Sequence, residues 1–244
     1  MVGCGNDGST DADKGKTAAA PAKTAEVVIY TNADEEAQTA MKNALDKNGM
    51  KGAYLIQSFG TSELGGKLAA EGKNIEADVV TLSTYYLDSF QKKEKLFADL
   101  QNKAKTIQPS PSYWTPILGN TGALFVNTEV LKQSKLEAPK SIADLAKPEY
   151  AGHISVPDIM GSSTSWLMTQ AVMSAQGEEA GAKTVAAIEK NAGAHLEKSG
   201  SGPLKKLRAG EAAVGFGLRH QAVADKARGL PIDYIDPTEG NFQL

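Results

Sequence analysis

Three short stretches rich in serine, threonine and glycine have the composition of an anion-binding site. They are Gly60-Thr61-Ser62, Gly161-Ser162-Ser163-Thr164 and Ser199-Gly200-Ser201-Gly202. Each precedes a sequence typical of a helix, whose first turn presents free backbone N–H groups and the positive end of the helix dipole. Serine and threonine are also the preferred helix N-caps, so one stretch alone could be purely structural. Three of them at predicted strand ends indicate a site for a phosphate-like group.

A scarce arginine and a histidine form a second candidate group. Arg219 and His220 follow the strand-like sequence AAVGFGL. A guanidinium at a glycine-rich strand end could clamp a phosphate-like group with two N–H donors. The alternative is a surface ion pair between Arg219 and Asp225 or Glu211.

Polar residues at the ends of two other predicted strands complete the set of candidates. Asn32, Asp34 and Glu35 follow the first strand, and Ser83 follows the strand within ADVVTLS. Acidic residues here could hold an ammonium or hydroxyl group of a ligand, and Asp34 could instead act as a catalytic carboxylate. A run of acidic residues is also typical of a solvated helix start, where the dipole favours negative charge.

Metal and nucleophile chemistry find little support in the sequence. His153, His195 and His220 lack metal-ligand spacing, and the single cysteine, Cys4, lies far from them. The nucleophile-elbow and Walker phosphate-loop motifs are absent. We therefore expect neither a metal site nor a cofactor, and the enzyme hypothesis, a phosphatase or transferase using Asp34, lacks a nucleophile–base pair.

Apolar strand-like runs alternate with helical sequences along most of the chain. This alternation predicts an α/β fold with mostly parallel sheets covered by helices on both faces. The expected strands are AEVVIY, AYLIQSF, ADVVTLS, GALFVN, HISVPD, AAVGFGL and PIDYIDP, with helices following most of them.

The first 25 residues have a different character. They are rich in alanine, lysine, aspartate and glycine without apolar periodicity, which predicts a disordered tether. Val2-Gly3-Cys4 resembles the end of a bacterial lipoprotein signal, so we expect Cys4 to be an acylation site. A net charge of −3 argues against nucleic-acid and anionic-membrane partners, which leaves membrane association through Cys4 alone.

Several phrases together resemble the class II solute-binding proteins of bacterial ABC importers. They are IYTNADEEA, SELGGKLAAEG, GALFVNTEVL, PKSIADLAKPEYAGHISVPD and GSGPLKKLRAGEAAVGFG. The resemblance implies an extracellular or periplasmic protein, not an enzyme, that closes two lobes on a small ligand and delivers it to a permease. We expect the tether at 1–25, lobe one at 26–121, lobe two at 122–235 with residues 123–127 crossing between lobes, and a return hinge strand at 236–244. The family pattern implies that the C-terminal part of lobe one is absent from this sequence.

The subgroup that the chain resembles contains ferric-ion, phosphonate and sugar-phosphate binders. Where ferric binders carry adjacent tyrosines, this chain reads Leu218-Arg219-His220-Gln221. An arginine disfavours Fe³⁺ and favours a phosphonate. The resemblance therefore favours a phosphonate or phosphate ester, such as 2-aminoethylphosphonate or a sugar phosphate. Ferric ion remains the alternative, supported by the adjacent pair Tyr85-Tyr86 at a different position.

Overall fold

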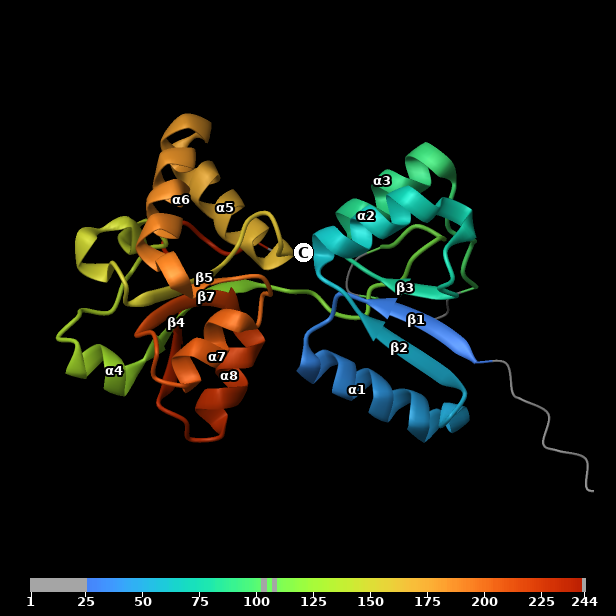
Figure 1. Ribbon diagram of the computed structural model, residues 1–244, viewed down its shortest axis with the longest axis horizontal. Coiled ribbons are helices and arrows are strands. Elements are labelled where there is room, and N and C mark those ends of the chain that lie inside the picture. The colour runs from blue at the N-terminus through green and yellow to red at the C-terminus, as the bar shows by residue number, and fades with distance from the viewer. Residues whose placement is uncertain (1–25, 102–104, 107–108, 243–244) are drawn as a thin grey trace, which may run out of the picture.

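Two α/β lobes lie side by side in the computed structural model, which describes residues 26–101, 105–106 and 109–242 (Figure 1). Lobe one holds a three-stranded sheet with helices α1 to α3, and lobe two holds a five-stranded sheet with helices α4 to α8. The α/β class predicted from the sequence is confirmed. Cys4 and the predicted tether lie outside the described residues.

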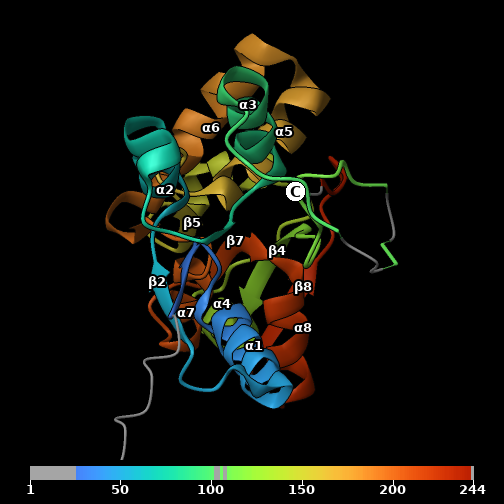
Figure 2. The same cartoon turned by 90° about the vertical axis from the view of Figure 1, so that its right-hand side faces the viewer.

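Lobe one is a parallel sheet with helices on both faces. Its strands, in the order β2-β1-β3, are β1 (Val27–Thr31), β2 (Tyr54–Ser58) and β3 (Val79–Thr81). Its helices are α1 (Glu35–Leu45), α2 (Thr61–Glu71) and α3 (Thr84–Glu94), with short turns Asp46–Met50 and Gly72–Asn74 after the first two. Helix α1 covers one face, and α2 and α3 cover the other (Figures 1 and 2). Each helix follows a strand, so the helix starts lie at the carboxyl edge of the sheet.

Lobe two is larger and mixed in strand direction. Its sheet has the order β6-β5-β7-β4-β8, formed by β4 (Gly122–Asn127), β5 (Ile154–Pro157), β6 (Leu196–Glu197), β7 (Val214–Leu218) and β8 (Ile232–Ile235). Its helices are α4 (Thr128–Gln133), α5 (Ser163–Gln176), α6 (Glu178–Ala192), α7 (Gly202–Arg208) and α8 (Arg219–Ala227). Short 3-10 turns occupy Ala143–Ala146, Pro148–Tyr150 and Gly193–His195. Helices α5 and α6 cover one face, and α7 and α8 cover the other (Figure 1).

Strand β4 departs from the predicted arrangement. It runs antiparallel to both β7 and β8, and all six of its residues are buried in lobe two. The prediction that residues 123–127 cross between the lobes is therefore wrong. The crossing precedes β4: Trp114 Nε1 donates to Asp88 of α3 at 2.8 Å, whereas the carbonyl of Thr121 accepts from the Arg219 N–H at 2.8 Å. A strand that is buried on both faces has a continuous apolar sequence whether its neighbours are parallel or antiparallel, so the sequence of β4 does not reveal its direction.

The segment after β8 also differs from the prediction. Residues 236–242, within the expected return hinge strand at 236–244, form no strand and contact lobe two. The Glu239 carboxylate accepts from the N–H groups of Ile142 and Ala143 at 3.0 and 2.8 Å, and Phe242 packs on the core of lobe two. A negative charge at a helical N-terminus is favourable, which explains why this segment stays with lobe two.

Buried apolar side chains fill both sides of the lobe-two sheet. One cluster contains Leu124, Ile154, Met168 and Phe216, and a second contains Phe125 on the opposite face. Strand β4, the first strand of lobe two, begins at Gly122, which is also the first residue predicted for lobe two. Within the described residues, none of the helices combines the length and apolarity needed to cross a membrane.

Candidate functional site

Two of the predicted hydroxyl-rich turns meet across the lobe interface. The Thr61 hydroxyl, at the start of α2 in lobe one, donates to Ser163 Oγ, at the start of α5 in lobe two, at 3.2 Å. Asn32 Nδ2 donates to the same Thr61 oxygen at 3.0 Å. Beside this contact, Ser62 Oγ donates to the Met160 carbonyl at 2.7 Å. The predicted residues Asn32, Thr61, Ser62 and Ser163 therefore lie together, joined by hydrogen bonds between the lobes.

Local capping leaves these side chains facing the interface. Helix α2 begins after Gly60, whose N–H donates to the Glu63 carboxylate at 3.2 Å. Helix α5 begins after Ser162, whose Oγ accepts from the Thr164 N–H at 3.2 Å. Because Gly60 and Ser162 occupy the cap positions, Thr61 and Ser163 are not needed as caps. The first turns of both helices bring N–H groups without intrahelical acceptors to this interface.

The third predicted turn packs against the second within lobe two. A Cβ on Gly200 would lie only 2.0 Å from Thr164 Oγ1 and 3.5 Å from Ser162 Oγ, so only glycine allows this approach. The hydroxyls of Ser199 and Ser201 lie 3.5 Å apart. We call the combined group the hydroxyl cluster; its members are Asn32, Thr61, Ser62, Ser162, Ser163, Thr164, Ser199, Gly200 and Ser201.

Ser83 is connected to the hydroxyl cluster less directly. It precedes α3 as the N-cap residue but makes no side-chain capping bond. Its link to the cluster runs through β3, because the Thr81 carbonyl accepts from the Asn32 N–H at 3.2 Å. The structure thus places Ser83 at the same edge of the lobe-one sheet, where its side chain does not cap α3.

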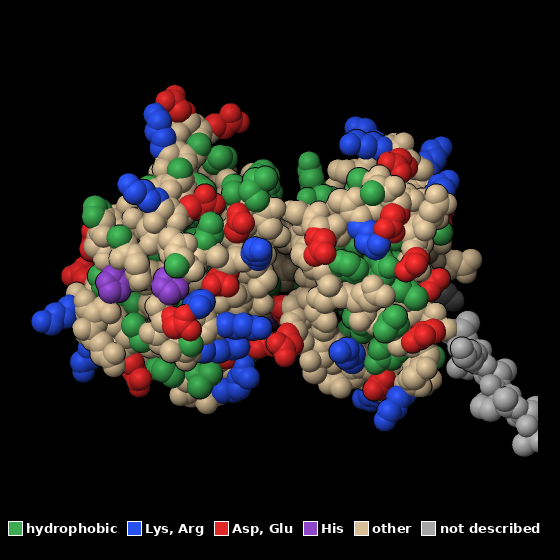
Figure 3. Space-filling model, viewed as in Figure 1, with side chains coloured by type: hydrophobic (Ala, Val, Ile, Leu, Met, Phe, Trp, Pro, Cys, Tyr) green, Lys and Arg blue, Asp and Glu red, His purple; other side chains and the backbone are tan. Residues whose placement is uncertain are grey.

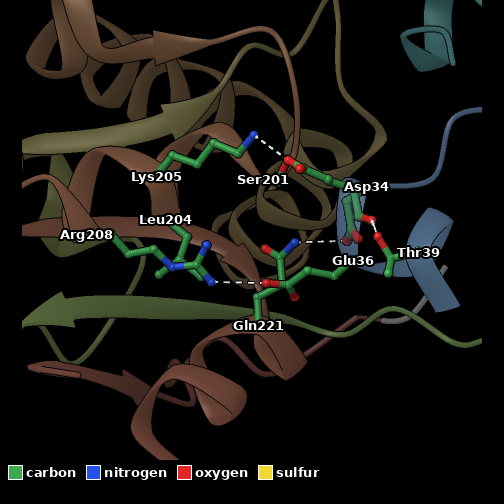
Figure 4. A pocket seen from close by; sticks show the side chains of 9 residues that line it. Asp34, Glu36, Thr39, Ser201, Leu204, Lys205, Arg208 and Gln221 are labelled. Carbon is green, nitrogen blue, oxygen red and sulfur yellow. Dashed lines mark hydrogen bonds and ion pairs between the residues drawn. The ribbon is translucent and has the colours of Figure 1, made fainter. Parts of the chain in front are cut away.

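A cavity of about 400 Å³ adjoins the hydroxyl cluster between the start of α1 and helices α7 and α8 (Figure 4). It is bounded by charged and polar side chains of both lobes, namely Asp34, Glu35, Glu36, Thr39, Ser201, Leu204, Lys205, Arg208 and Gln221. Three contacts cross it: Gln221 Nε2 to Asp34 at 2.9 Å, Lys205 Nζ to Glu35 at 3.4 Å, and Arg208 to Glu36 at 3.2 Å. The acidic start of α1 thus faces basic residues of lobe two.

Asp34 is the least exposed carboxylate at the start of α1. Its Oδ1 accepts from the Ala37 N–H at 2.8 Å, which caps α1, and its side chain is 8% exposed. Burial opposes ionisation, but interactions with His220, the Ala37 N–H and Gln221 outweigh it and hold the pKa of Asp34 below its usual value. Asp34 is therefore ionised at neutral pH.

Arg219 is paired within lobe two. Its guanidinium donates to both oxygens of Asp236 at 2.9 and 3.2 Å and lies 4.4 Å from the centre of the Tyr234 ring. The structure therefore does not present it as an unpaired cation at the hydroxyl cluster, and its partner is neither Asp225 nor Glu211. His220 does reach the interface, where its Nε2 lies 3.7 Å from Asp34 Oδ2.

Tyr85 and Tyr86, the adjacent tyrosines that supported the ferric-ion alternative, lie in different environments. Tyr86 packs its ring against Phe90 and against Gly65, where a Cβ would lie 2.5 Å from the ring. Tyr85 is 69% exposed. Among the described residues, no group of three or more His, Cys, Asp and Glu side chains is arranged to hold a metal ion.

Sequence reasoning missed Lys205, Arg208 and Gln221. They contact residues of α1 that lie 170 to 187 positions earlier in the chain, so no local pattern connects them. The sequence contains few arginines and many lysines, and this rarity could have identified Arg208. A position that keeps arginine is one where the planar guanidinium and its paired N–H donors matter.

The chain belongs to a family of bacterial extracellular solute-binding proteins, whose model matches residues 74–243. It is 29% identical over 213 residues to an Fe(3+)-binding periplasmic protein of Serratia marcescens, covering 83% of this chain and 59% of that protein. It is 24% identical over 228 residues to an uncharacterized protein of Haemophilus influenzae, covering 88% of this chain and 64% of that protein. The chain thus spans about three fifths of the length of these relatives.

Solved structures confirm the two-lobed class II architecture. The periplasmic binding protein AfuA of Actinobacillus pleuropneumoniae, with fructose-6-phosphate bound, matches with a TM-score of 0.74 at 24% identity, covering 90% of this chain and 71% of that one. Iron-bound HitA of Pseudomonas aeruginosa matches with a TM-score of 0.63 at 19% identity, covering 86% and 69%. These similarities establish the fold. The ligand must be inferred from the residues of this chain.

Proposed function

We propose that this chain is the ligand-capturing part of an extracellular solute-binding protein that delivers a small phosphonate or phosphate ester to an ABC importer permease. The observation that carries the proposal is the hydrogen bond between Thr61 and Ser163, which brings the first turns of α2 and α5 together across the lobes. A phosphonate-type group placed here would accept hydrogen bonds from both lobes and stabilise their closure. Compounds to test include 2-aminoethylphosphonate and sugar phosphates.

Positive charge for this group comes mainly from the two helix starts. The N-terminal dipole ends of α2 and α5 favour an anion. Arg219 already uses Nε and one Nη nitrogen on Asp236, so a ligand would have to compete with that carboxylate for a bidentate contact. His220, beside Asp34, is the other nearby group that can carry positive charge.

Ferric ion is the second candidate. The Serratia marcescens relative is named as an Fe(3+)-binding protein, and HitA is described as iron-bound. The donors of the hydroxyl cluster are hydroxyl and amide groups, whereas Fe³⁺ is a hard cation that prefers anionic oxygen ligands. The site therefore favours the phosphonate proposal.

Calorimetric titration with 2-aminoethylphosphonate, fructose 6-phosphate and ferric citrate tests the ligand class. We expect heat with at least one of the phosphorus compounds, and at least tenfold weaker binding in Thr61→Ala and in Ser163→Ala, because a hydrogen bond to a charged group contributes about 1.5–3 kcal/mol. Ser174→Ala, at the exposed far end of α5, is the matched control. Binding of ferric citrate alone, unaffected by either variant, would contradict the proposal.

We also propose that Cys4 anchors the protein to the extracellular face of the membrane through a lipid. Support comes from Val2-Gly3-Cys4, which resembles the end of a lipoprotein signal, and from the family's extracellular character. Cell fractionation of wild type and Cys4→Ala tests this. Release of only the variant is expected, and retention of both in the membrane fraction would refute a lipid anchor at Cys4.

A further inference from the structure

Gln221 carries a buried acceptor without a hydrogen-bond partner. The residue is 2% exposed, and its Oε1 has no partner. Its Nε2 donates to Asp34 Oδ2 at 2.9 Å. Because an ionised carboxylate only accepts, the amide nitrogen must face Asp34, and the oxygen must face the opposite side. There it lies toward the lobe-two side chains that line the cavity (Figure 4).

The strongest ion pairs around the cavity balance one another. Arg208 donates to both oxygens of Asp225 at 2.6 and 2.8 Å, and Arg228 donates to Asp225 Oδ1 at 2.7 Å. The same two arginines reach Glu36 at 3.2 and 3.6 Å. Two cations therefore face two carboxylates, and this group adds no net charge to the cavity.

The remaining charged groups leave the cavity acidic. Lys205 is the one further cation among the lining residues, which also include the two carboxylates Asp34 and Glu35. Its contact with Glu35 is 3.4 Å long and both side chains are exposed, whereas Asp34 is 8% exposed. His220 lies 3.7 Å from Asp34 and adds charge only when protonated. The Gln221 oxygen lacks a hydrogen-bond donor, and the cavity has one more carboxylate than it has cations. A cationic N–H group would satisfy both.

We infer that this cavity is a subsite for a primary ammonium group, which the Gln221 amide oxygen of lobe two binds directly while the Asp34 carboxylate of lobe one, on the other side of the Gln221 amide, supplies negative charge. The inference rests on the proposed function, because it assigns the other end of a ligand whose phosphonate lies at the hydroxyl cluster. Ser201 belongs to both regions, since it lines the cavity and neighbours Ser199. A zwitterion that occupies both regions would pass Ser201.

This subsite differs from the one expected from sequence. Asn32 donates its amide to Thr61 and belongs to the phosphonate end, while Glu35 is solvent-exposed and faces Lys205. Gln221, absent from the sequence-based candidates, becomes the residue that determines specificity. When the lobes close, an ammonium group would give Gln221 Oε1 the donor it lacks, whereas a second anionic group would meet the Asp34 carboxylate. The site thus selects aminoalkylphosphonates over amine-free or doubly anionic analogues.

Calorimetry with 2-aminoethylphosphonate and ethylphosphonate tests the subsite, because the two probes differ only in the amine. We expect wild type to bind the aminoethyl compound at least tenfold more tightly. Gln221→Met, which keeps the side-chain length but removes both the amide oxygen and the N–H that donates to Asp34, should lose most of that preference, measured as the ratio of the two affinities in the variant. Gln133→Met, at an exposed position of α4, is the matched control and should keep the preference.

The outcomes separate this inference from the proposed function. Equal binding of both probes by wild type would overturn the ammonium subsite and leave the phosphonate site standing; a neighbouring protein donor such as Lys205 would then satisfy Gln221 on closure. A preference that survives intact in Gln221→Met would also overturn the role of Gln221. Failure of both probes to bind wild type would overturn the phosphonate assignment and the subsite with it. The wild-type comparison needs no variant, so it stands even if Gln221→Met folds poorly.

Discussion

The two lobes differ greatly in how much apolar surface they bury. In lobe two, buried residues fill both sides of the sheet, and Leu124 and Phe125 are fully buried. Among the described residues of lobe one, the buried cluster is limited to Tyr30, Leu64, Leu68 and Phe90. Leu55 of β2 and Val79 of β3 are 42% and 45% exposed, and α1 contributes no buried residue.

This difference bears on how the site operates. Thr61 lies on the weakly packed lobe and Ser163 on the strongly packed one. Regions with few buried apolar contacts open at lower free-energy cost than a packed core. We therefore expect lobe two to act as the rigid platform and lobe one to gain most stability when an anion joins the two.

Truncating one leucine in each lobe is the strongest test of the difference in packing between the lobes. Leu124→Ala should destabilise the protein by about 3 kcal/mol, because it leaves a cavity in a closed core, whereas Leu55→Ala should cost less than about 1 kcal/mol. Urea unfolding of both variants measures the difference. Equal losses would show that the lobes are equally well packed.

The same difference explains what the sequence could predict. Among the described residues, seven of the eight strands lie near the apolar runs that predict them, whereas β6, only two residues long, is not predicted. Helices α3 and α4 are not predicted either, because α3 buries only Leu87 and Phe90 and α4 buries no residue, so both carry a weak periodic signal. The direction of β4 was also not predictable from its own residues, since burial on both faces erases alternation.

The candidate site shows a similar division. The serine and threonine turns were predictable because helix starts favour these residues locally. The contacts of Glu36 with Arg208 and of Asp34 with Gln221 were not, because they depend on how one lobe lies against the other. The partner of Arg219 was not predictable either, because Asp236 follows β8, which only the fold brings near the end of β7.

Arg208 offers a second comparison, between a buried partner and an exposed one. Asp225 has a fully buried side chain, so Arg208→Met should destabilise lobe two by about 2 kcal/mol, less than for a fully buried pair because Arg228 also contacts Asp225. Glu36→Gln removes only the exposed contact between lobes and should cost less than about 1 kcal/mol. Thermal unfolding of the two variants measures both effects. A larger loss for Glu36→Gln would mean that the interface, not lobe two, holds the stabilising pair.

Asp144 provides a smaller, pH-dependent effect confined to lobe two. Burial raises its pKa, but hydrogen bonds from Lys147 and from the N–H groups of Lys140 and Ser141 outweigh burial and lower the pKa to about 2. Since the pKa of Asp144 in the folded protein lies below its usual value of 3.8, the contribution to stability is complete above pH 3.8 and disappears as the pH falls through about 2.

Asp144→Asn should therefore cost about 1 kcal/mol near pH 7, the usual value of a helical cap, and progressively less below pH 3.8. Glu179→Gln, in an exposed pair on α6, is the control and should show almost no effect. Urea midpoints measured between pH 2 and 7 give the comparison. A difference that stays constant with pH would contradict the role of the Asp144 carboxylate.

The central claim is that a phosphonate-type group contacts both Thr61 of lobe one and Ser163 of lobe two, whose hydroxyls lie 3.2 Å apart. Phosphorus NMR of 2-aminoethylphosphonate tests it most directly, because the signal reports the surroundings of the phosphorus atom itself. We expect wild type to shift and broaden the resonance, and the double variant Thr61→Ala with Ser163→Ala to leave it at its free position. A resonance that wild type leaves unchanged, or a shift that persists in the double variant, would contradict this account.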